Sequence, residues 1–222
     1  MKIIARIYND FTEKFGIPRQ SGITDTLISK IVFEKQYRDP SAIRGIEEFS
    51  HLWLIWNFSE NENDGFSPTV RPPRLGGNKR VGVFATRSPF RPNPIGLSSV
   101  RLIKTQITSE GPTLFVSGAD LMNNTPIYDI KPYIPYSDCH TDAIGSFAEE
   151  KKDYSLKVIC SEDVLKDFPK VKLDTLIRVL EGDPRPSYHT DKERIYGMTF
   201  AGFNIKFKVN EDTLTVVNLE RT

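Results

Sequence analysis

Short apolar runs separated by polar turn residues dominate the first half of the chain. Most of these runs are short and apolar, mix β-branched with charged residues, or alternate apolar and polar positions, and such patterns predict strands. Six segments have this pattern: residues 2–8, 26–34, 51–58, 80–86, 95–107 and 113–122. One short helix is expected over residues 39–50, because Pro40 stands near its start and Glu47 and Glu48 would lie on its polar side.

The second half is more mixed. Residues 123–136 contain three prolines and predict a loop, and the polar residues 136–152 predict a linker. A strand at 154–160 and a helix from Ser161 are expected to follow. Leu173, Leu176, Ile177 and Leu180 have the spacing of an amphipathic helix, which Gly182 would end. Three closing strands, expected at 194–200, 202–209 and 213–219, predict a meander.

Strands without regularly alternating helices favour an antiparallel rather than a doubly wound fold. The expected fold class is therefore mainly β: a single-sheet antiparallel β-barrel over residues 1–142, followed by a small α+β domain over residues 153–222.

Positive charge is concentrated in one stretch of this nearly neutral chain. Between Gly65 and Ser109 there are eight Arg or Lys and no Asp or Glu, so the remainder carries a net charge of about −7. Pro and Gly are frequent in the same stretch, which predicts rigid loops presenting guanidinium groups to an anionic partner.

Several function classes are disfavoured. No apolar run approaches the roughly 20 residues that span a bilayer, and the N-terminus lacks a secretory apolar segment. Cys139 and Cys160 lack metal-site spacing, as do the three histidines, so no metal is expected. A reduced, cytoplasmic setting is the simplest interpretation. The glycine-rich fingerprints of nucleotide-binding folds are absent.

Long segments of the chain resemble the TrmO family, also called TsaA-like or YaeB-like. The most specific is VRPPRLGGNKRVGVFATRSPFRPNPIG, at residues 70–96. Others are FGIPRQSG at 15–22, IRGIEEFSHLWLI at 43–55, TPIYDIKPYIPY at 125–136 and DPRPSY at 183–188. The resemblance implies an S-adenosylmethionine-dependent tRNA methyltransferase acting on N6 of threonylcarbamoyladenosine (t6A) next to the anticodon, giving m6t6A. It also implies a homodimer whose barrel binds the cofactor.

Carried over motif by motif, the resemblance implies these cofactor contacts: Pro18, Arg19, Gln20, His51, Leu52, Arg87, Leu121, Asn124, Thr125 and Pro126. This chain has Asn123-Asn124 where many relatives have Asp-Gly. Asn tolerates a positive φ, so the turn is expected to survive without the carboxylate. On sequence alone, His51 could equally be a core histidine, Arg19 a solvated charge and Arg87 part of a structural ion pair.

Methyl transfer requires alignment of nucleophile, methyl carbon and sulfur, and an acceptor for the N6 proton would help. Asp129, beside the expected cofactor turn, is the candidate base, with Tyr128 and Asn93 as orienting residues; a turn-capping role for Asp129 is the alternative. The residues expected to contact tRNA are Arg71, Arg74, Lys79, Arg80, Arg91, Arg185 and Tyr188. Two other functions remain open: a methyltransferase with another acceptor, and a non-catalytic RNA-binding barrel.

Overall fold

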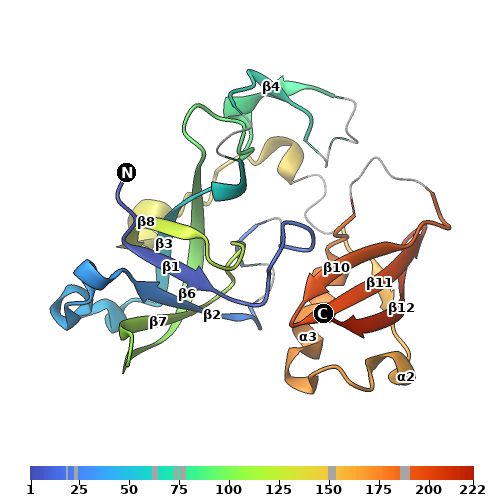
Figure 1. The fold of residues 1–222 in the computed structure, drawn as a ribbon. Helices are drawn as coiled ribbons and strands as arrows, with labels where there is room; N and C mark the ends of the chain where they lie inside the picture. The colour runs from blue at the N-terminus through green and yellow to red at the C-terminus, as the bar shows by residue number, and fades with distance from the viewer. Residues whose placement is uncertain are drawn as a thin grey trace.

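A six-stranded antiparallel sheet organises the N-terminal part of the chain (Figure 1). Its strands are β1 (Ala5–Tyr8), β2 (Ile28–Phe33), β3 (His51–Asn57), β6 (Ile95–Thr108), β7 (Gly111–Ser117) and β8 (Pro126–Pro132). They pair in the order β1-β2-β7-β6-β3-β8, and β8 also pairs with β1. This computed structural model describes residues 1–18, 20–22, 25–61, 65–72, 75, 79–149, 154–185 and 191–222. The expected mainly β, antiparallel architecture is confirmed.

The loop predicted at 123–136 is wrong, because half of it forms β8. This strand pairs with β3 on one side and with β1 on the other. Pro126 and Pro132 stand at its two ends, where a missing backbone donor costs little pairing. The prolines therefore mark the limits of a strand that the sequence pattern had hidden.

The helix predicted at 39–50 is also wrong. The segment forms two 3-10 turns, Pro40–Ile43 and Ile46–Glu48. Gly45 separates them with a φ of 82°, a left-handed conformation that interrupts helical hydrogen bonding.

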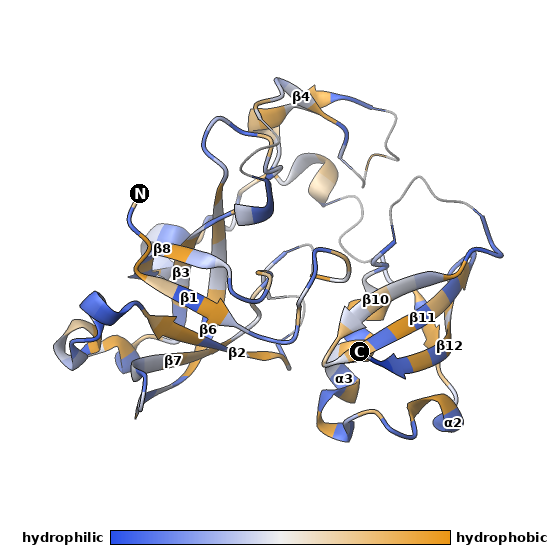
Figure 2. Cartoon of the chain, in the orientation of Figure 1, coloured by the Kyte–Doolittle hydropathy of each residue, from blue (hydrophilic) through white to orange (hydrophobic). Residues whose placement is uncertain are grey.

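A separate flap, made of residues 65–72 and 79–91, extends from the sheet between β3 and β6. It contains the short strands β4 (Thr69–Val70) and β5 (Val81–Gly82), followed by a 3-10 turn at Val83–Ala85. The predicted strand at 80–86 is thus shorter than expected. Figure 2 shows apolar residues in this flap, away from both larger sheets.

The C-terminal part forms a second sheet covered by helices. Strands β10 (Tyr196–Phe200), β11 (Phe203–Asn210) and β12 (Thr213–Arg221) form the predicted meander, and β9 (Lys157–Ile159) joins β12 in parallel. Helices α2 (Glu162–Leu165) and α3 (Leu173–Glu181) follow β9, as predicted, whereas α1 (Pro135–Asp138) is a single turn near the end of the first unit. None of the helices in the described ranges has the length and apolar character needed to cross a bilayer.

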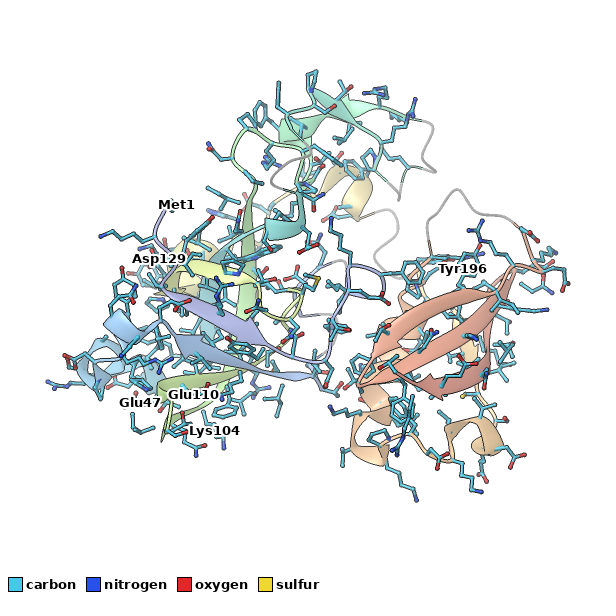
Figure 3. The ribbon with its side chains drawn as sticks, viewed as in Figure 1. Met1, Glu47, Lys104, Glu110, Asp129 and Tyr196 are labelled. Atoms are coloured by element: carbon cyan, nitrogen blue, oxygen red, sulfur yellow. The ribbon has the colours of Figure 1, made fainter. Side chains whose placement is uncertain are left out.

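The residues between β1 and β2, here called the 9–27 loop, connect the two units. Phe11 and Leu27 belong to the hydrophobic core of the C-terminal unit, with Tyr196, labelled in Figure 3. The Lys172 ammonium lies 2.6 Å from a carboxylate oxygen of Asp10. The C-terminal unit therefore packs directly on a loop that belongs to the N-terminal sheet.

Candidate active site

A pocket of about 470 Å³ lies where β3 ends and β6 begins. Trp56 pairs there with Gly96, and Asn57 with Ile95. Loop residues from 14–20, 58–61, 86–91 and 120–125 complete its wall. Segments far apart in sequence thus converge on one cavity.

The indole of Trp56 forms a buried apolar wall of this pocket. It lies against Gly96, where an added Cβ would be only 2.2 Å from indole atom Cε2. The ring of Phe58 packs beside it, with centroids 4.3 Å apart. Gly96 is therefore required by the close approach of the indole.

A hydrogen-bonded chain leads from Trp56 to a carboxylate in the pocket wall. The Trp56 Nε1–H donates to Ser98 Oγ over 2.9 Å, and the Ser98 hydroxyl donates to Asp120 Oδ1 over 2.5 Å. Burial raises the pKa of the Asp120 carboxyl, while the Ser98 hydrogen bond and the charge of Arg87 oppose that shift. Sequence reasoning missed Asp120, which follows the end of β7 in the segment GADL.

Four of the predicted cofactor residues do line the pocket: Pro18, Gln20, Arg87 and Thr125. Arg87 NH1 donates to Gln20 Oε1 over 2.7 Å, which joins two segments 67 positions apart. The residues come from three separate motifs, so the fold brings those motifs together at one site.

The other predicted cofactor residues are placed differently. Leu52 and Leu121 are fully buried in the hydrophobic core and do not line the cavity. Asn124 and Pro126 are also absent from the lining; Asn124 has the expected positive φ, of 66°. Arg19 lies outside the described residues.

His51 lies at the opposite end of β3 from the pocket residue Trp56. Five steps along the strand separate them by about 16 Å, at roughly 3.3 Å per residue. His51 Nδ1 is 2.9 Å from Ser50 Oγ, and its ring meets the edge of Tyr133. His51 is therefore not part of this pocket.

Comparison with known proteins gives consistent results for both units. Residues 6–139 match the N-terminal domain of tRNA-methyltransferase O, and residues 153–222 match the TrmO C-terminal domain. The chain is 38% identical to the tRNA (adenine(37)-N6)-methyltransferase of Escherichia coli strain K12, covering 98% of this chain and 96% of that protein. The chain belongs to the TrmO family.

Other members of the TrmO family extend the comparison. A Pseudomonas aeruginosa protein, provisionally named an S-adenosylmethionine-dependent methyltransferase, is 38% identical over 82% of this chain and 75% of its own length. The crystal structure of TrmO from Pseudomonas aeruginosa superposes with a TM-score of 0.76 at 29% identity, covering 98% of this chain and 97% of that chain.

The predicted catalytic residues of this TrmO chain do not line the pocket. Asp129, labelled in Figure 3, lies in β8 opposite Ile55, and its side chain is 44% exposed, 3.0 Å from the Lys131 ammonium. Tyr128 precedes it in the same strand, beside a bulge in the pairing with β3. Asn93 is exposed in the loop before β6. The sequence placed Asp129 near the cofactor turn, but strand β8 carries it away from the cavity.

The basic segment of the TrmO chain divides into exposed and structural residues. Arg71 and Lys79 are exposed on the flap. Arg80 is exposed too, but its Nε–H donates to Thr69 Oγ1 over 2.8 Å. Arg91 lines the pocket, and its NH1 donates to the carbonyl of Thr86 over 2.8 Å. The predicted tRNA contacts Arg74 and Tyr188 lie outside the described residues.

Arg185, another predicted tRNA contact, is largely buried in an ion pair. Its Nε–H lies 2.9 Å from Asp183 Oδ1, with 15% and 10% of the two side chains exposed. The Tyr154 hydroxyl donates to the other Asp183 oxygen over 2.9 Å. This arrangement does not leave Arg185 on an open surface for phosphate, so the direct contact predicted for it is not supported.

The described ranges contain no group of three or more His, Cys, Asp or Glu side chains placed to hold a metal ion. The groups that the TrmO pocket offers include the apolar wall at Trp56, the guanidinium of Arg87 and the carboxylate of Asp120.

Proposed function

We propose that this protein is an S-adenosylmethionine-dependent methyltransferase that modifies N6 of the adenosine at position 37 of tRNA. The observation that carries this proposal is the convergence of Pro18, Gln20, Arg87 and Thr125 on one pocket. Membership of the TrmO family supports the same activity, because the E. coli relative named for it aligns over nearly the whole chain.

The pocket residues fit the chemistry of the cofactor. S-Adenosylmethionine has an aromatic base, a polar sugar and amino acid, and a sulfonium cation. Trp56 and Phe58 offer apolar surface for a base, while Arg87 and Gln20 offer a charged donor and an amide. The cofactor supplies an electrophilic methyl group when it is bound.

Asp120 is a half-buried carboxylate of the pocket wall, and we assign it a hydrogen-bond acceptor role toward the adenosine N6–H. An amine conjugated to a purine and a carbamoyl group is a weak nucleophile while its proton is held. An acceptor that draws on that proton increases its reactivity. Ser98 and Trp56 fix the orientation of the carboxylate through their hydrogen bonds.

A base role for Asp129 remains the competing assignment, and paired variants separate the two. Asp120→Asn and Asp129→Asn both keep side-chain shape and remove the carboxylate. Single-turnover methylation at saturating cofactor should fall by at least about 100-fold in Asp120→Asn, the scale of general-base catalysis, and by little in Asp129→Asn. The reverse order would assign the base to Asp129.

The substrate is proposed to be t6A rather than unmodified adenosine, giving m6t6A. The threonylcarbamoyl arm carries a carboxylate, which a guanidinium binds through paired hydrogen bonds. Loss of one such charge-assisted contact, worth about 1.5–3 kcal/mol, would lower kcat/KM by roughly 10- to 100-fold. Methylation rates on the same tRNA with and without the arm test this, and equal rates would contradict it.

Three structural features belong to the same proposal: a single-sheet β-barrel as the cofactor-binding domain (residues 1–142), a separate C-terminal domain (153–222) and a homodimer. The return of β8 to β1 supports the first. Mass spectrometry of anticodon-loop nucleosides, from cells with and without this protein, tests the activity. Light scattering of the purified protein tests the dimer.

A further inference from the structure

The side chains of two phenylalanines, Phe66 and Phe84, lie exposed and next to each other on the flap. Phe84 is 71% exposed and Phe66 is 54% exposed. Their ring centroids are 6.4 Å apart, and the planes are inclined by 28°. Large aromatic side chains are usually covered by a core or by a partner. This pair belongs to neither of the two hydrophobic clusters.

Backbone hydrogen bonds join the two segments that carry the rings. Ser67 N–H donates to the Phe90 carbonyl over 3.1 Å, and Val83 N–H donates to the Pro68 carbonyl over 3.0 Å. Each bond joins the strand segment that carries Phe66 to the segment that carries Phe84. A surface ordered in advance loses less conformational entropy when it binds a partner.

Arg91 connects the ring pair to the pocket. Its guanidinium carbon lies 5.7 Å from the centroid of the Phe84 ring, and the same residue lines the pocket. Thr86, Arg87 and Pro89, on the same segment, line the pocket as well. Phe84 therefore lies on the segment that forms one wall of the pocket, and Phe66 lies beside it.

The charge around the rings favours an anionic partner over an apolar protein surface. No Asp or Glu occurs between Gly65 and Ser109. In the described part of the chain, no carboxylate forms an ion pair with any basic side chain of this stretch. Aromatic faces beside unpaired guanidinium groups are the usual means of binding unstacked bases and their phosphates.

We propose that Phe84 and Phe66 form a stacking platform for unpaired bases of the anticodon loop, adjacent to the pocket that takes the target adenosine. The inference rests on the proposed function, because it assumes that the RNA substrate is a tRNA. It adds two side chains that recognise a base by its aromatic face, and these act alongside the charged residues that neutralise phosphates.

Binding of a synthetic anticodon stem-loop to Phe84 variants tests the platform. Phe84→Ala and Phe84→Leu should weaken binding by about 5- to 150-fold, the range expected for losing one base–aromatic stack. Phe84→Trp should bind at least as tightly as the parent, because it keeps an aromatic face. Tyr136→Ala is the matched control, since Tyr136 is an aromatic residue 91% exposed on α1; its affinity should be unchanged.

Two further measurements identify the contact. The salt dependence of binding should keep its slope in Phe84→Ala and become shallower in Arg71→Gln, because stacking releases no counterions. A series of stem-loops, each with the base removed from a different loop nucleotide, should include one that binds the parent less tightly. That nucleotide would be the one whose base stacks on Phe84. That same abasic change should have no further effect in Phe84→Ala.

The possible results separate this inference from the proposed function. If the parent fails to bind the stem-loop, the proposed function fails. If the parent binds and Phe84→Ala binds equally well, only the platform is wrong. A loss of self-association in Phe84→Ala, measured by sedimentation, with RNA affinity per protomer unchanged, would reassign the rings to an interface between two copies of the chain.

Discussion

Arg87 NH1 donates to Gln20 Oε1 over 2.7 Å, and this contact closes one side of the pocket between the flap and the 9–27 loop. Because the contact is exposed, it contributes little to stability, and its main value is to orient two polar groups toward a ligand.

Arg87→Ala is therefore expected to bind S-adenosylmethionine about 10-fold or more weakly, with little change in Tm, and Gln20→Ala about 3- to 5-fold more weakly. These effects correspond to a charged hydrogen bond of roughly 1.5–3 kcal/mol and a neutral one of about 1 kcal/mol. Isothermal titration calorimetry measures both. Full affinity in a folded Arg87→Ala protein would remove Arg87 from the cofactor site.

Gly96→Ala should damage the pocket wall. The new methyl group would lie 2.2 Å from the Trp56 ring, so the indole or the strand has to move. We expect a loss of about 1–3 kcal/mol in the free energy of unfolding, as overpacked cores show, together with weaker cofactor binding. Gly82→Ala is the matched control, since nothing lies within 4 Å of its Cβ position and its φ is −59°. Equal stability of the two variants would contradict the packing interpretation.

Stability should depend on pH through Asp120. Burial raises its pKa in the folded state, so the folded protein retains this proton at pH values where the unfolded chain has released it. The contribution of this proton to the free energy of unfolding is complete below the ordinary pKa of an Asp carboxyl. It is lost as the pH rises through the raised pKa of Asp120 in the folded state. Asp120→Asn should remove that fall, and the parent and variant curves of unfolding free energy against pH should diverge above about pH 4. Parallel curves from pH 4 to 8 would show that the carboxyl is ionised throughout.

The buried pair of Asp183 and Arg185 should matter for folding more than for RNA contact. Asp183→Asn keeps a residue that tolerates the φ of 52° at this position but removes the negative charge that faces Arg185. The expected loss is about 2–4 kcal/mol, measured by urea unfolding. The exposed pair Arg178–Asp174 provides the control, because Asp174→Asn should leave the urea midpoint almost unchanged. An equally small loss of stability in both variants would show that the Asp183–Arg185 ion pair contributes no more to folding than an exposed pair does.

Periodicity predicted the strands and helices whose side chains follow a simple alternation, including β3, β6, α3 and the closing meander. It failed at β8, where prolines at the two ends of a strand resemble a loop, and at Gly45, whose positive φ divides an apparent helix. Both failures concern backbone conformation, which residue type alone determines weakly.

Part of the candidate site was predictable from sequence motifs. Arg87 and Gln20 belong to distinctive motifs and do meet at the pocket. Leu52 and Leu121 belong to comparable motifs, yet they point into the core. Leu52 lies on the same face of β3 as the pocket residue Trp56 but four positions away, and Leu121 follows the end of β7 with its side chain in the core. Asp120 was not predicted, yet it lines the pocket. Its environment depends on Trp56 and Ser98, which are distant in sequence.

Gly16 and Met198 show how the two units are thermodynamically linked. Gly16 has a φ of 92°, and the buried Met198 side chain lies where a Cβ at Gly16 would be, 2.6 Å away at Cε. Ile17 and Pro18, the next residues of the 9–27 loop, line the pocket. A ligand that binds there stabilises a loop whose ordered form requires the C-terminal core, and it therefore stabilises that core by mass action. Amide hydrogens of β10 should accordingly exchange more slowly when S-adenosylmethionine is added, although no residue of β10 lines the pocket. On this expectation, hydrogen exchange in the C-terminal unit would rise or fall with binding of a ligand in the pocket of the other unit.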